Sequence, residues 1–309
     1  MLRNLLFAFF CYCALVAATC ERPVELPFDI PDPRLVVVCN FTGGAFFIVQ
    51  VSKSRSALDQ SPEEYIANAK VDIYQGDTFI ETLELVPRGG EIRTPYYITR
   101  ELKPKQGVIY TIRVEAPGFE TVMAQSSIPE ATEIISFNLS DVMVGLTDSG
   151  DLRYDYNAEI RFEDFPEEVN YYHLNLYQQF LGYELVEGDT NLVDSSIQVV
   201  VFSNSINNNF LLAYFEGGIL FEDKAFLSNR IVIPVAVQID PASYLIGKVY
   251  AELRTVSEEY YKFHQTLNQQ QSNPGGAFTE PVIVYNNIEN GHGIFAGYNA
   301  STDSVFVRR

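Results

Sequence analysis

Three histidines, His173, His264 and His292, are candidates for acid–base catalysis or metal binding. A zinc site typically places two histidines on one helix face, or pairs a histidine with a carboxylate at a set spacing, and neither pattern occurs in this sequence. His173 lies in a strand-like run and His264 lies among aromatic residues on a predicted helix, where each is best interpreted as a core or surface histidine. His292 stands between two glycines, and a functional role stays open for it.

Motifs for nucleophilic catalysis and nucleotide binding are missing from the sequence. No Gly-x-Ser-x-Gly motif occurs, and no P-loop or dinucleotide-binding glycine pattern is found. Cys39 has no plausible partner base, and it ends the apolar run Leu35–Cys39, which favours a small buried core residue. We therefore expect no catalytic residue, no cofactor and no enzymatic activity.

One acidic run could supply oxygen ligands to calcium. It comprises Asp148, Ser149, Gly150 and Asp151, with Asp155 close behind. The run lacks the twelve-residue loop and the bidentate glutamate of an EF-hand. A solvated segment is the better interpretation, so we expect no metal site and predict that residues 141–151 form a linker or an inter-domain loop.

The first twenty residues indicate secretion and a lipid anchor. Arg3 precedes an apolar run, Leu5–Ala18, that is too short to span a bilayer, and small residues lead into Cys20. A cysteine at such a point is where bacterial lipoproteins are cut and diacylated. We expect a signal peptide over residues 1–19, lipidation at Cys20 and a proline-rich tether over residues 20–34. The alternative is ordinary signal cleavage nearby, with Cys20 free or bridged to Cys39.

The charge balance narrows the class of partner. Asp and Glu number 40 against 21 Lys and Arg, which gives a net charge of −19. Nucleic acids and anionic lipid surfaces would repel such a chain, so we expect no nucleic-acid partner and membrane attachment only through the N-terminal lipid.

The rest of the chain has the pattern of β-sandwiches, with short alternating or β-branched runs broken by Gly, Pro, Asn and Asp. About seven candidate strands between residues 35 and 135 match an immunoglobulin- or transthyretin-like sandwich. They cover residues 35–41, 46–51, 70–74, 79–86, 96–99, 108–115 and 121–126. Ser61, Pro62 and Glu64 additionally predict a short helix that ends by about Asn68.

A second β-rich domain is predicted over residues 152–309. Its candidate strands cover residues 156–162, 170–178, 197–202, 231–239, 248–255, 281–285 and 304–307. One helix of some length is expected over Ser257–Gln271, because acidic residues occupy its first turn and aromatic residues share one face. The predicted fold is therefore all-β, with two domains and one helix in the C-terminal half.

The segment Asn286–Gly297 mixes asparagine, glycine and two large apolar residues. We expect it to pack against the second domain with Ile294 and Phe295 in the core, because buried side chains must offset the entropy of ordering it. One of its glycines, Gly291 or Gly293, should then hold a backbone angle that other residues resist. The alternative is an exposed loop whose Glu289 and His292 contact a partner.

Four stretches together resemble a family of exported Bacteroidota lipoproteins, the domain-of-unknown-function family numbered 4249. They are Cys20 with Leu35-Val36-Val37-Val38; Asn68-Ala69-Lys70-Val71 with Gly107–Ile112 and Ile128-Pro129; Asn170-Tyr171-Tyr172 with Glu222–Phe226 and Ser257–Tyr261; and Asn287–Phe295. The last is the most specific, and the resemblance runs from Cys20 almost to the C-terminus. Family members resemble outer-membrane lipoproteins, are often encoded beside TonB-dependent transporters and have no established enzymatic activity.

The resemblance implies a non-catalytic outer-membrane lipoprotein that is an accessory or ligand-binding partner of a TonB-dependent transporter. The alternative is a structural subunit of a cell-envelope complex, such as a secretion or gliding apparatus, with no transported ligand. A hydrolase of unfamiliar design is a third hypothesis. A concave pocket with convergent acids and a histidine would favour the hydrolase, and a flat exposed patch would favour the other two.

Overall fold

Strands dominate this protein, which is 60% strand and 8% helical, and the all-β prediction is confirmed. The computed structural model describes residues 32–56, 59, 61–87, 94–165, 168–186, 189–204, 212–215, 217–241, 244–272 and 282–308. The predicted signal peptide, Cys20 and most of the tether lie outside the described residues. Among the described residues, no helix has the length and apolar character needed to cross a membrane.

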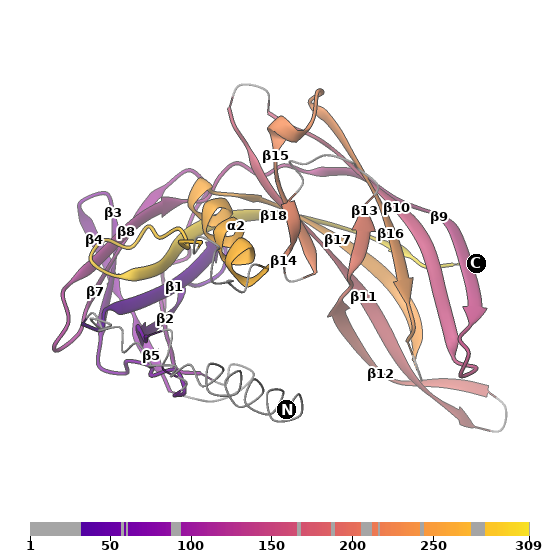
Figure 1. Cartoon of the computed structure of the whole chain (residues 1–309), viewed down its shortest axis with the longest axis horizontal. Helices are drawn as coiled ribbons and strands as arrows, with labels where there is room; N and C mark the ends of the chain where they lie inside the picture. The colour runs from indigo at the N-terminus through magenta and orange to yellow at the C-terminus, as the bar shows by residue number, and fades with distance from the viewer. Residues whose placement is uncertain are drawn as a thin grey trace, which may run out of the picture. The chain divides into compact units, whose positions relative to one another are not determined.

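Two sets of strands form the first sandwich (Figure 1). An aromatic core lies between them. One set is a four-stranded sheet in the order β4-β3-β7-β8, formed by β3 (Lys70–Gln75), β4 (Thr78–Thr82), β7 (Ile109–Glu115) and β8 (Val122–Ser127). The other belongs to a larger sheet and contains β1 (Leu35–Thr42), β2 (Ile48–Lys53), β5 (Glu84–Val86) and β6 (Tyr96–Ile98). Phe41, Phe47 and Tyr110 pack at its centre, with Phe41 and Phe47 ring centroids 4.8 Å apart.

The second sandwich places a four-stranded sheet against the other half of the larger sheet. The smaller sheet has the order β13-β16-β10-β9, formed by β9 (Ile134–Leu146), β10 (Leu152–Glu163), β13 (Phe202–Asn204) and β16 (Arg230–Ile239). Facing it are β11 (Tyr171–Val186), β14 (Leu212–Phe215), β15 (Gly218–Glu222) and β17 (Leu245–Val256). Phe162 and Tyr172, from the two layers, have ring centroids 5.1 Å apart in this core.

One strand, β18 (His292–Phe306), joins the two halves of the larger sheet. Its first part runs parallel to β1, from Val36↔His292 to Thr42↔Tyr298, and its second part runs antiparallel to β17. Phe295 is fully buried in the first sandwich, beside Phe41. The prediction that Asn286–Gly297 packs against the second domain is therefore wrong for Phe295, although its burial is as expected. The boundaries at 35–135 and 152–309 stay a prediction.

The helix α2 (Glu258–Ser272) covers the face of the larger sheet opposite the sandwich cores. Because neighbouring strand residues point to opposite faces, Ile294 packs with Tyr260 and Tyr261 of α2 while Phe295 enters the first core. Ser257 precedes the helix and its hydroxyl accepts a hydrogen bond from the Tyr260 N–H. The predicted helix Ser257–Gln271 is confirmed.

Several sequence predictions of local structure are wrong, and in the first two cases below tertiary pairing decides the outcome. Residues 61–68 form no helix, since Ile66 N–H donates to the Val51 carbonyl and Glu64 accepts from Lys53 along β2. Residues 141–151 are no linker but part of the hairpin of β9 and β10, with Gly150 at φ +88° in the turn. Residues 282–285 form no strand.

Candidate interaction surface

The segment before β18 is held by its asparagines. Asn287 is bonded twice to the Phe295 backbone: its amide donates to the carbonyl at 2.8 Å, and its Oδ1 accepts from the N–H at 3.0 Å. Asn286 donates to the carbonyls of Ile288 and Gly291. Gly293 has φ +115°, and a Cβ there would lie 2.0 Å from the Val37 carbonyl oxygen, so the expectation of a glycine-specific backbone is confirmed. Much of this segment therefore serves to hold the backbone in place.

Glu289 and His292 are both exposed, and they face different neighbours. The Glu289 N–H donates to the Met123 carbonyl of β8 at 2.8 Å. His292 lines an open groove of about 450 Å³ with residues that include Arg55 and Glu63, and Glu289 is not among the lining residues. Their role in contacting a partner stays a prediction.

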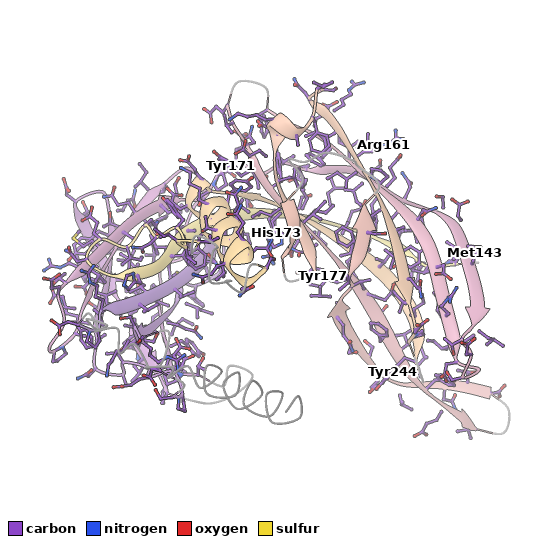
Figure 2. All side chains as sticks on the ribbon, in the orientation of Figure 1. Met143, Arg161, Tyr171, His173, Tyr177 and Tyr244 are labelled. Atoms are coloured by element: carbon purple, nitrogen blue, oxygen red, sulfur yellow. The ribbon has the colours of Figure 1, made fainter. Side chains whose placement is uncertain are left out.

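The other two histidines are buried between the sheet and α2. The ring of His173 lies 3.0 Å from the Tyr260 hydroxyl, measured from Nδ1, and Figure 2 places His173 beside the helix. His264 contacts Tyr260, with ring centroids 4.2 Å apart and the ring planes tilted by 55°. Burial lowers the pKa of His264 to about 4, and the Arg254 guanidinium adds to this shift. Both histidines therefore belong to the packed interior.

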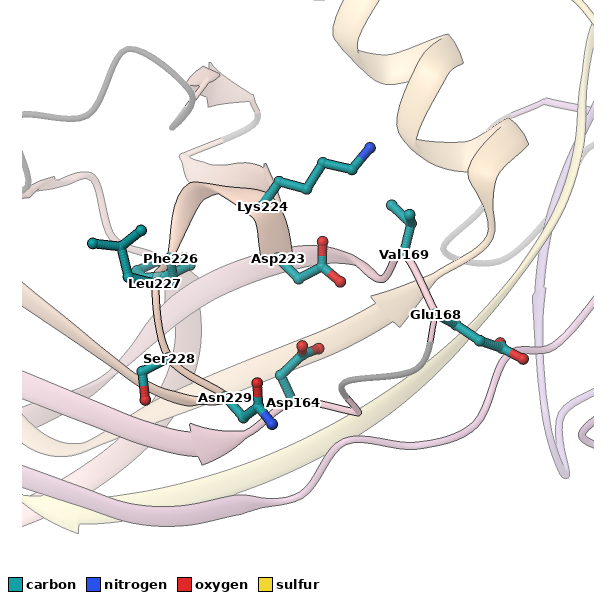
Figure 3. Close-up of a pocket in the computed structure, with 9 residues that line it drawn as sticks. All are labelled: Asp164, Glu168, Val169, Asp223, Lys224, Phe226, Leu227, Ser228 and Asn229. Carbon is teal, nitrogen blue, oxygen red and sulfur yellow. The ribbon is translucent and has the colours of Figure 1, made fainter.

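One pocket of about 370 Å³ brings two carboxylates together (Figure 3). Asp164 follows β10, and Asp223 begins the short 3-10 helix η1 (Asp223–Ala225). The Tyr172 hydroxyl donates to Asp164, whose pKa is raised by burial and further by the nearby Asp223 carboxylate. Asp223 accepts from the Asn170 N–H at 2.8 Å.

The pocket does not match the hydrolase hypothesis. Its lining residues are Asp164, Glu168, Val169, Asp223, Lys224, Phe226, Leu227, Ser228 and Asn229, and this set contains no histidine. In the part of the chain that the structure describes, no group of three or more His, Cys, Asp or Glu side chains is arranged to hold a metal ion.

A different surface is formed by residues 177–199, which we call the β11–β12 ribbon. Here β11 pairs with β12 (Asp189–Val199) from Tyr177↔Val199 to Val186↔Asp189. The pairing of β11 with β17 ends at Leu181↔Leu245, so the last part of β11 pairs with β12 alone among the described strands. Every residue of β12 is exposed, including Leu192 at 60%, Val193 at 56% and Ile197 at 57%.

The ribbon carries charge of one sign. Residues 177–199 include the acidic residues Glu184, Glu187, Asp189 and Asp194, and they contain no Lys, Arg or His. The sequence pattern predicts strands at 170–178 and 197–202 but does not predict the pairing that the structure shows in this region. The signal was present, because Glu187-Gly188-Asp189 separates two apolar-rich runs and glycine followed by aspartate is a hairpin signature.

Two solved structures have a weak similarity to this chain. A chimeric titin Z1Z2-Z1Z2 tandem functionalized with a fibronectin peptide is 12% identical, with 73% of this chain and 92% of that chain covered and a TM-score of 0.19. The collagen adhesin from S. aureus is 7% identical, with 90% and 96% covered and a TM-score of 0.17. Scores this low carry no argument. A comparison with curated proteins finds no match.

The family comparison is decisive where the structural ones are not. The family model described as "Domain of unknown function (DUF4249)" matches residues 21–304, which is nearly the whole chain and includes α2 and all of β18 except its last two residues. The chain belongs to the DUF4249 family.

Proposed function

We propose that this protein is a non-catalytic lipoprotein of the bacterial outer membrane, anchored through Cys20, that works as an accessory or ligand-binding partner of a TonB-dependent transporter. The location rests on the N-terminal signal and on the resemblance of the chain to exported lipoproteins. The observation that carries an interaction role is the β11–β12 ribbon, because it exposes apolar side chains and, among the described strands, an edge without a pairing partner.

Such a ribbon gains by contact with another protein. A two-stranded hairpin is only marginally stable in water by itself. Leu192, Val193 and Ile197 are all more than half exposed. Fully burying a large aliphatic side chain contributes about 1.5–3 kcal/mol of favourable free energy, which a partner could supply by covering them. Exposed apolar side chains on an open strand edge are typical of protein–protein contact.

The edge strand of the opposite sheet shows how this fold protects an edge. In β9, Asp141 has a left-handed backbone at φ +53° and lies in a β-bulge, where the register shifts between Asp155 and Asn157 of β10. Bulges and charged residues discourage pairing at an open edge. The ribbon also has one register shift, between Gly182 and Tyr183, but on one side of it residues 195–199 pair with residues 177–181 in unbroken register. Their outer edge is regular enough to accept another strand.

The test is affinity purification of the full-length chain from solubilised native outer membranes, with co-purifying proteins identified by mass spectrometry. We expect a TonB-dependent transporter to co-purify, and Ile197→Ser to reduce its recovery. Ile109→Ser is the matched control, because both isoleucines are 57% exposed and Ile109 lies on β7 in the first sandwich. Recovery of secretion or gliding components instead of a transporter would replace this proposal with the structural-subunit alternative.

A further inference from the structure

We propose that the outer edge of β12, over Ser195–Val199, pairs with an extended strand of a partner protein in which apolar residues alternate with lysine or arginine. This inference rests on the proposed function and adds the mode of binding and the chemistry of the partner. It follows from three properties of the ribbon: the direction of its backbone groups, the alternation of its side chains and its charge.

The backbone of β12 presents hydrogen-bonding groups to its outer edge. The Val200 N–H donates to the Leu176 carbonyl at 2.9 Å, so these two residues are a hydrogen-bonded pair between the strands. Hydrogen-bonded and non-hydrogen-bonded pairs alternate along an antiparallel ladder. In the register Tyr177↔Val199, the N–H and C=O groups of Ser195, Ile197 and Val199 therefore point away from β11. Among the described residues, β12 pairs with no strand other than β11.

The side chains of β12 divide between two faces. Because side chains alternate along a strand, Ser195, Ile197 and Val199 lie on one face, and Asp194 lies on the other with Ser196 and Gln198. A strand that pairs along this edge places its own alternate side chains beside these two rows. Apolar side chains suit the row with Ile197 and Val199, and a cationic side chain suits the row with Asp194.

The charge decides between a basic partner and a second copy of this chain. All the charged residues of the ribbon are acidic, and the whole chain carries a net charge of −19. Two identical ribbons would bring these acidic residues together, and like charges across an interface oppose binding. A strand with lysine or arginine instead meets opposite charge along its length. Strand addition to an open edge is a recurring mode of peptide recognition, in which backbone bonds give affinity and alternate side chains give specificity.

Variants at one exposed position separate these contributions. Ser195→Pro removes the outward N–H, and proline is tolerated at an edge where that N–H makes no ladder bond, so the fold should survive while strand addition is lost. Ser195→Lys and Ser195→Glu change the same side chain with opposite charge. A basic strand should bind Ser195→Lys about tenfold more weakly than wild type, and Ser195→Glu at least as tightly as wild type.

The direct probe is a synthetic peptide of alternating valine and lysine, compared with one of alternating valine and glutamate. Binding to the purified full-length chain is followed by fluorescence anisotropy, and amide hydrogen exchange locates the contact. We expect the lysine peptide to bind about tenfold more tightly than the glutamate peptide, and to slow exchange at residues 195, 197 and 199. Equal binding of the two peptides, or protection confined to other strands, would overturn the inference.

Two further outcomes separate this inference from the proposed function. If wild type recovers a transporter from membranes and Ser195→Pro recovers as much, strand addition at this edge is wrong while the accessory function stands. If wild type recovers no transporter but binds the lysine peptide at β12, the function is wrong while the site stands. A wild-type dimer in sedimentation velocity that Ser195→Pro converts to a monomer would assign the edge to a second copy and overturn the basic partner.

Discussion

Phe295 shows how one residue can link two distant parts of a sequence. It lies in β18 yet packs against Phe41 and Phe47 of the first sandwich, whose ring centroids are 4.7 Å and 6.0 Å away. Its backbone N–H and carbonyl are both hydrogen-bonded to the side chain of Asn287. The side chain therefore attaches the C-terminal strand to the N-terminal core.

Replacing this side chain should destabilise the protein strongly. Phe295→Ala should lower the free energy of unfolding by about 3–5 kcal/mol, because the residue is fully buried and the cavity cannot fill easily. Urea unfolding followed by circular dichroism measures this change. Phe165→Ala is the matched control at a position that is 39% exposed, and it should cost much less. Equal midpoints for the two variants would contradict the structural role of Phe295.

His264 gives the protein a stability that depends on pH. Its pKa is lowered to about 4 in the folded state, whereas an unfolded histidine has a pKa of about 6.5. Between these values the unfolded chain binds the proton and the folded chain does not, so the free energy of unfolding falls as the pH falls from about 6.5 to 4. The contribution of this one group over the window is about 3 kcal/mol.

The test compares how stability depends on pH in wild type and His264→Gln. Urea unfolding at several pH values between about 7 and 4 should give a shallower loss of stability in the variant. His292→Gln controls for the loss of a histidine at an exposed position. Identical pH profiles for wild type and His264→Gln would mean that this histidine is not held neutral by burial.

At the scale of elements, local patterns predicted most strands well. The hairpin of β3 and β4, the strand β7 and the helix α2 each have signals within a few residues, such as Gly76 at φ +57° in the turn. The predicted strand 79–86 is divided instead, because Leu83 is buried and the chain passes from β4 in one sheet to β5 in the other. Such a change of sheet depends on distant partners.

Long-range pairing explains why the rest could not be predicted. The parallel register of β1 with β18 joins residues 36–42 to residues 292–298, and no local pattern specifies that partner. The ribbon is partly predictable from sequence, because its turn has a local signal. The exposure of its strands depends on distant parts of the chain and has no local signal. An alternating run predicts a strand. Only the strand order of the folded sheet shows that, among the described strands, β12 pairs with β11 and has no partner on its outer edge.

At the scale of the whole molecule, the net charge of the chain bears on how the proposed anchor would work. A net charge of −19 repels an anionic membrane surface, so the protein body should contribute little direct affinity for lipid. An acylated Cys20 would supply that affinity, because each buried methylene contributes about 0.8 kcal/mol. The ribbon would then supply contact with a membrane-embedded partner. The lipid and the ribbon would be two modes of attachment that can be tested separately.

Cys20→Ser tests the lipid directly, and combining it with a ribbon variant separates the two modes. Cys20→Ser should move the protein from washed membranes to the soluble fraction, because one strand contact is weak without the anchor that keeps the partners close. Partial retention that disappears when Ser195→Pro is added would assign the remainder to the ribbon. Full retention of the double variant in washed membranes would show that neither the lipid nor the ribbon holds the protein there.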